Sequence, residues 1–103
     1  MLPDFLLLHR RADPAFALLP PAEQSQIKAK FTTLYDLLPE DWRLEDAWQL
    51  DTPDHVWIVR IHPTLLAYFQ PLPERRFLIE EFVRQSFLDS FAKSRLPVEA
   101  QRA

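Results

Sequence analysis

Three side chains in the second half of the chain have the chemistry needed to cleave a phosphodiester bond. Arg60 and Arg84 each carry a guanidinium, which can bind two phosphate oxygens at once and stabilise the charge on them. Tyr68 has a phenolic hydroxyl that can donate a proton if it opens to a cleft, although a core aromatic is the commoner role for such a residue. Arg60, Arg84 and Tyr68 are therefore the candidate catalytic residues.

Structural roles compete with this interpretation. Arg60 and Arg84 can instead form salt bridges with Glu80 or Glu81 across a sheet, and we favour this because charged pairs in small domains are usually structural. His62 could act as a general base next to Arg60. A His before Pro at a strand end is more often a solvated turn residue, and we expect that role here.

The composition indicates one small globular domain and excludes several classes of enzyme. The chain has 103 residues, 48% of them hydrophobic, so we expect a single domain over residues 1–103 with one core. It contains no Gly and no Cys. Phosphate-binding glycine loops, thiol catalysis and thiolate zinc sites are thereby excluded.

No cofactor, metal or membrane segment is expected. Asp51, Asp54 and His55 are metal-ligand types, but their spacing matches no strong template. No apolar run approaches the roughly 20 residues of a membrane span, and the N-terminus lacks the pattern of a signal peptide. The default location is the cytoplasm. The net charge of −3 argues against broad electrostatic capture of nucleic acid.

The region around the candidate residues is predicted to be a three-stranded meander. The segment 56–61 (VWIVRI) is largely apolar on both faces, which is typical of a strand inside a sheet. Pro63 follows it, and Pro71 and Pro73 interrupt the chain again, because proline cannot donate to a strand ladder. The predicted strands are 56–61, 65–70 and 76–83.

Helices are predicted before this meander. The apolar segment 5–10 fits a buried strand, and Asp13-Pro14 is expected to cap a short helix ending near residue 19. A longer helix over 22–38 carries an apolar stripe, which comprises Ile27, Phe31, Leu34 and Leu38. The predicted fold is α+β, a small antiparallel sheet with two N-terminal helices packed on one face.

The end of the chain allows two interpretations. Residues 76–83 can be the last strand, followed by a short C-terminal helix from about residue 86. Alternatively, apolar residues recur at four-residue steps, which predicts one long helix over 74–94. In either case Phe87, Leu88 and Phe91 are candidate partner-binding residues, to be covered by another protein or by a second subunit.

The order of strand, two helices and meander resembles the RelE/ParE superfamily, the toxins of bacterial type II toxin–antitoxin systems. The resemblance covers roughly residues 5–95. It is most specific in residues 57–60 (WIVR), in the aromatic pair 68–69 (YF), and in residues 77–86 (FLIEEFVRQS), which are similar to the last strand of HigB-type members. The resemblance implies an antitoxin partner and a target that is either ribosome-bound messenger RNA or DNA gyrase.

The chain also differs from the members that cleave messenger RNA on the ribosome. Those commonly have an arginine where this chain has Leu65, and a basic pair where it has Arg84-Gln85. A Tyr or His often completes their site near the C-terminus, where this chain has Phe87 and Phe91. These differences argue against ribonuclease activity without affecting the fold.

Three functions follow as hypotheses. The leading one is a toxin-like protein, either a ribosome-dependent endoribonuclease or an inhibitor that binds DNA gyrase. The alternative is a protein of the same fold that has lost activity and serves in interaction or assembly. Whether the chain is an enzyme is left open by the sequence.

Overall fold

The described part of the chain folds into a short strand, two helices and four further strands. The computed structural model describes residues 2–51 and 53–84. In chain order the described elements are β1 (Leu6–Leu8), α1 (Ala12–Leu18), α2 (Pro21–Asp36), β2 (Ala47–Gln49), β3 (Trp57–His62), β4 (Leu65–Leu72) and β5 (Arg76–Arg84). Short 3-10 helices, Pro39–Glu45 and Pro73–Arg75, precede β2 and β5.

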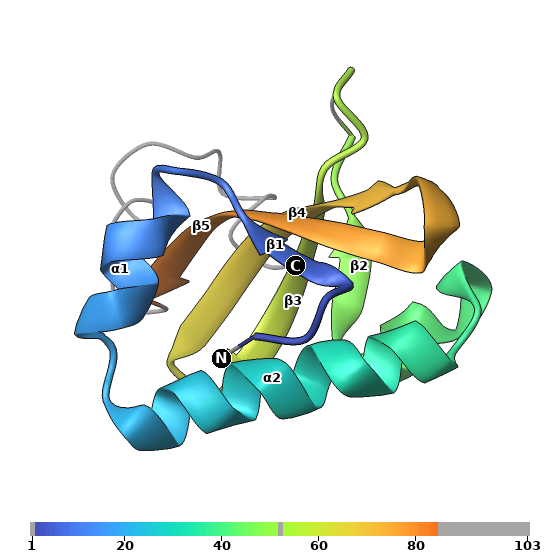
Figure 1. Ribbon diagram of the computed structural model, residues 1–103. Helices are drawn as coiled ribbons and strands as arrows, with labels where there is room; N and C mark the ends of the chain where they lie inside the picture. The colour runs from blue at the N-terminus through green and yellow to red at the C-terminus, as the bar shows by residue number, and fades with distance from the viewer. Residues whose placement is uncertain (1, 52, 85–103) are drawn as a thin grey trace, which may run out of the picture.

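The strands form one sheet of order β1-β5-β4-β3-β2 (Figure 1). The pairs β2–β3, β3–β4 and β4–β5 are antiparallel, as a meander requires. β1 lies beside β5 and is parallel to it, because the long connection after β1 carries both helices. The α+β fold is confirmed, and the sheet is mixed rather than wholly antiparallel.

The predicted meander is confirmed, and the prediction of one long helix over 74–94 is wrong. Arg76–Arg84 is strand β5, which pairs with β4 on one side and β1 on the other. Pairing on both sides satisfies its backbone groups, so the four-residue apolar spacing does not decide its structure. The predicted C-terminal helix and the partner-binding residues Phe87, Leu88 and Phe91 lie outside the described residues.

Both helices differ in detail from their predictions. α1 begins at Ala12, so Asp13 lies in its first turn instead of capping it. α2 ends at Asp36, and Leu37 is already extended. Leu38 is consequently 58% exposed, whereas the other members of the predicted stripe are buried: Ile27, Phe31 and Leu34.

The core lies between α2 and one face of the sheet. Phe31 of α2 contacts Phe69 of β4 edge-on, with ring centroids 5.1 Å apart, and also packs near Phe77 of β5. Trp42 closes the end of this cluster, and its indole N–H donates to the carbonyl oxygen of Leu34 at 2.9 Å. Figure 1 shows α2 along this face, and α1 contacts β5. This arrangement distinguishes a helix-covered face of the sheet from an opposite face.

The chain makes left-handed turns without glycine. The non-glycine residues with positive φ in the described segments are Asp46, His55, Glu74 and Arg75. Asp46 (φ 58°) ends the 3-10 helix before β2, and its carbonyl oxygen accepts a hydrogen bond from the Arg60 N–H at 3.0 Å. Glu74 and Arg75 form the turn between β4 and β5, and each costs about 1–2 kcal/mol relative to glycine.

Candidate functional site

Arg84, a candidate catalytic residue, is bound to a carboxylate on the helix-covered face. Its Nη1 donates to Glu23 Oε2 and its Nη2 to Glu23 Oε1, both at 2.7 Å. Glu23 lies in the first turn of α2, where the helix dipole also favours a negative charge. The salt bridge predicted for Arg84 therefore exists, but with Glu23 rather than with Glu80 or Glu81.

His62 joins the same cluster. Its Nε2 lies 2.5 Å from Glu23 Oε2, and the Thr64 N–H donates to its Nδ1 at 3.2 Å. Because Nδ1 accepts, the Nε2–H group donates a hydrogen bond to the Glu23 carboxylate. The prediction of a solvated turn residue is wrong, since His62 is half-buried and connects the end of β3 to α2.

A bulge in each strand directs these side chains toward α2. In the pairing of β3 with β4, one extra residue stands between Arg60 and His62, so His62 comes opposite the core residue Leu65. In β5 an extra residue, Glu80, shifts the alternation and brings Arg84 opposite Leu65 as well. Both side chains thus reach the helix-covered face.

The cluster changes the ionisation of its members. Hydrogen bonds from Arg84 and then from His62 lower the pKa of Glu23 from 4.5 to about 2. The carboxylate in turn raises the pKa of Arg84. At neutral pH Glu23 is ionised and Arg84 is engaged in a bidentate, charge-assisted pair, which is among the stronger side-chain contacts.

Arg60 lies on the opposite face of the sheet. Arg60 pairs in register with Leu66, and Ile58 pairs with Tyr68. These four side chains alternate with the core residues of β3 and β4, so they lie on the face opposite the core. The Nη1 of Arg60 donates to the carbonyl oxygen of Pro63 at 3.2 Å. The two arginines predicted to bind one phosphate are therefore on different sides of the sheet.

Tyr68 shares a sheet face with Arg60 and stands opposite Glu81 of β5. Burial, and to a smaller extent the charge of Glu81, raises the pKa of Tyr68 above its usual value. Its hydroxyl is protonated at neutral pH, so it can donate a proton and is unsuited to accept one. Tyr68 therefore lies on the same face of the sheet as Arg60 and on the opposite face from Arg84.

The other charged candidates have separate surroundings. Glu80 pairs with Arg11, whose Nη2 lies 3.4 Å from Glu80 Oε1. His55 Nδ1 lies 3.3 Å from the Gln49 amide nitrogen. Among residues 2–51 and 53–84, no three His, Asp or Glu side chains are grouped to hold a metal ion.

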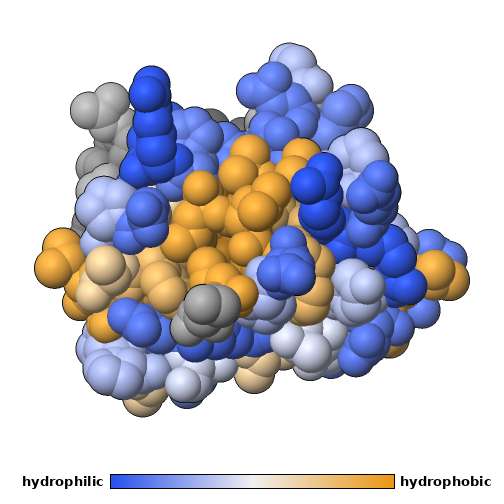
Figure 2. Space-filling model, in the orientation of Figure 1, coloured by the Kyte–Doolittle hydropathy of each residue, from blue (hydrophilic) through white to orange (hydrophobic). Residues whose placement is uncertain are grey.

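Apolar surface gathers between the helices and the edge of the sheet. Figure 2 shows it at the centre of one view, between α1, α2 and β1. Hydrophobic residues of these elements are only partly buried where they pack against the core, among them Leu8, Phe16 and Leu19. Leu18, at the end of α1, is 86% exposed. Such a surface is suited to contact with another protein.

Glu23 is the residue that sequence reasoning missed. It does not belong to the apolar stripe predicted for its helix, and its partners are 39 and 61 positions away. The signal that could have indicated it is its place in the first helical turn, where a carboxylate often has a structural role.

Comparison of the chain with protein-family models, with curated protein sequences and with solved structures found no match. In the part of the chain that the structure describes, neither helix has both the length and the apolar character needed to cross a bilayer.

Proposed function

We propose that this chain is the toxin-like component of a bacterial toxin–antitoxin pair, acting in the cytoplasm by binding a protein target. The element order, a strand and two helices followed by a meander, supports the resemblance to the RelE/ParE superfamily. The resemblance implies two partners, a cognate antitoxin and, for a ParE-type inhibitor, DNA gyrase.

The observation that carries the binding mode is the position of Arg84. Stabilising charge at a scissile phosphate calls for several cationic or hydrogen-bond donors converging on one oxygen cluster. Arg84 is held by Glu23 on the helix-covered face, and Arg60 lies on the opposite face. These two guanidinium groups therefore do not converge, which favours binding over RNA cleavage.

A second candidate is ribosome-dependent endoribonuclease activity. The observation that favours it is that Arg60 and Tyr68 share one face of the sheet, where a guanidinium and a protonated phenol could serve one phosphate. With Arg84 absent from that face, we expect weak or no cleavage, and Arg60→Ala should abolish whatever cleavage remains.

Expression in bacterial cells separates these functions. We expect the wild type to arrest growth without new messenger RNA ends at ribosomal positions, and co-expression of the neighbouring reading frame to relieve the arrest. Purified chain should then inhibit DNA supercoiling by gyrase. Arg10→Ala, an exposed change on a distant loop, is the matched control for Arg60→Ala.

Two results would replace the proposal. Abundant cleavage at ribosomal positions that disappears in Arg60→Ala would identify the ribonuclease. Normal growth at high expression, with a partner still co-purifying, would identify an inactive interaction or assembly protein of the same fold.

A further inference from the structure

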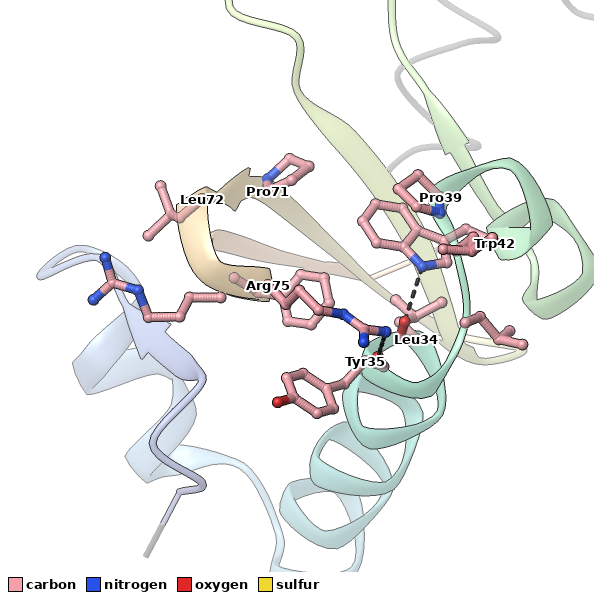
Figure 3. Close-up of a pocket in the computed structure, with 11 residues that line it drawn as sticks. Leu34, Tyr35, Pro39, Trp42, Pro71, Leu72 and Arg75 are labelled. Carbon is pink, nitrogen blue, oxygen red and sulfur yellow. Dashed lines mark hydrogen bonds between the residues drawn. The ribbon is translucent and has the colours of Figure 1, made fainter.

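A cavity of about 320 Å³ lies at the end of the molecule remote from the Glu23 cluster. It is enclosed by the C-terminal end of α2, the 3-10 helix that follows, and the turn between β4 and β5 (Figure 3). Apolar side chains form most of its wall, including Leu34, Leu37, Trp42, Leu72 and Phe77. Its volume is at the lower end of the range of sites that bind small ligands.

Among the described residues, the charged ones that line the cavity are Arg75 and Arg76, and no Asp or Glu lines it. This is unlike the chain as a whole, whose net charge is −3. The lining therefore combines an apolar wall with positive charge, which is complementary to an apolar molecule that carries an anionic group.

Arg75 is held in place at this cavity. Its guanidinium carbon lies 5.0 Å from the centroid of the Tyr35 ring, and its Nη2 donates to the Tyr35 carbonyl oxygen (Figure 3). That carbonyl is at the C-terminal end of α2, where the helix leaves acceptors unpaired. Arginine has five N–H donors, so the contact with Tyr35 leaves others for a ligand.

The backbone of the turn that carries Arg75 is strained. Glu74 and Arg75 have φ of 66° and 59°, a conformation that glycine adopts without cost. Consecutive left-handed residues direct Arg75 toward α2, whereas Arg76 already belongs to β5. Strain of this kind often accompanies ligand sites. A glycine would relieve it but would provide no guanidinium.

We propose that this cavity binds a carboxylate with an apolar body, such as an aryl or branched alkyl acid. The carboxylate pairs with Arg75, and the apolar body packs against Trp42 and Phe77. Arg76 and Leu72 pair with each other in register and alternate with Phe77 and Pro71, so their side chains turn away from the face that carries Phe77. The same chemistry occurs in a free small acid and in the hydrophobic C-terminal residue of a polypeptide. This site is independent of the toxin-like function proposed above.

The Trp42 indole N–H provides the measurement, because it lies in the cavity wall and has a defined acceptor in Leu34. The ¹⁵N-labelled full chain is titrated with phenylacetate and 4-methylpentanoate, and with the corresponding neutral amides. We expect a saturable shift of the Trp42 indole signal with the acids and about ten-fold weaker binding of the amides. Trp48, which is outside the cavity lining, is the internal reference.

Variants test the cationic groups. Arg75→Gln should weaken binding of the acids about five- to ten-fold without affecting the amides. Arg76→Gln, at the neighbouring position whose Nε donates to the Pro73 carbonyl oxygen, should leave binding nearly unchanged. Arg10→Gln, a charge change of the same kind at a distant exposed position, should leave binding unchanged. Thermal melts establish that each variant is folded.

The outcomes are distinguishable. Equal binding of acids and amides, no effect of Arg75→Gln, or no Trp42 shift up to about 10 mM acid would each overturn the proposal. A short peptide ending in Leu with a free carboxylate is then compared with its amidated form. Binding of the free form about ten-fold tighter than 4-methylpentanoate assigns the site to a polypeptide C-terminus, and equal binding assigns it to a small acid.

Discussion

The two faces of the sheet use the same side-chain chemistry for different purposes. On the helix-covered face, Arg84 and His62 converge on Glu23, and the three groups satisfy one another. On the opposite face, Arg60 and Tyr68 stand on neighbouring strands with Glu81 nearby. The two arginines thus have different surroundings according to the face that each reaches, and residue type alone does not predict these surroundings.

The largest expected effect comes from disrupting the helix-covered cluster. Glu23→Gln removes the charge that holds Arg84 and weakens the contact with His62, so the free energy of unfolding should fall by about 2 kcal/mol. Urea denaturation at pH 7 measures this change. Glu81→Gln, on an exposed side chain of the other face, is the control and should change stability by less than about 0.5 kcal/mol. Similar losses in both variants would remove the distinction between the faces.

Acid should weaken the same cluster. Because the folded-state pKa of Glu23 is lowered from 4.5 to about 2, its ionised form stabilises the protein above about pH 4.5. This contribution is lost as pH falls from there toward 2. We expect it to amount to about 1–2 kcal/mol, since the Arg84 side chain is 45% exposed and partly screened by water.

Urea denaturation of the wild type and Glu23→Gln at pH 7, 4.5 and 3 tests this assignment. The difference in stability between the two proteins should shrink at the lowest pH. If it stayed constant across the range, the stabilising effect of Glu23 would not depend on its charge.

A smaller effect is expected at the ion pair of Arg11 and Glu80. Their closest atoms are 3.4 Å apart in a single contact, and the side chains are 64% and 18% exposed. Arg11→Ala should cost about 0.5–1 kcal/mol in the free energy of unfolding, because the contact is longer than those of Glu23 and the arginine is mostly in solvent. A loss as large as that of Glu23→Gln would mean that bidentate geometry is not what makes the Glu23 cluster strong.

The smallest effect concerns Tyr68 on the opposite face. Burial is the main cause of its raised pKa and Glu81 the lesser one, so Glu81→Gln should lower the pKa of Tyr68 slightly. NMR detection of the labelled Tyr68 ring during an alkaline titration measures this change. An increase in the pKa would contradict the proximity of the two side chains.

Sequence reasoning predicted the elements of this fold better than the contacts between them. The prolines at 63 and 73 and the apolar strands were sufficient to predict the meander, because both signals are local. Pro71 does not interrupt the chain as predicted, since β4 continues through it to Leu72. The parallel pairing of β1 with β5 joins segments about 70 positions apart and carries no local signal. The end of α2 was also overestimated, since Leu38 continued the apolar spacing beyond the last helical residue.

The candidate site was predicted only in part. Arg60 of β3 and Tyr68 of β4 lie on one face of the sheet, which is compatible with their positions in the predicted strands. Arg84 could not be assigned to a face by simple alternation, because bulges change the count of residues along the strand. Its partner Glu23 lies on a helix, and only tertiary structure brings the two together.

The extra residue in β5 has an evolutionary consequence. Phe77 and Ile79 point into the core, so uninterrupted alternation from them would direct Arg84 to the face that carries Arg60. Glu80 reverses this. The effect of losing one codon in this strand therefore depends on its position. Loss of Glu80 would remove the bulge and leave Arg84 opposite Leu65, whereas loss of a residue between Glu80 and Arg84 would keep the bulge and turn Arg84 to the surface that carries Arg60.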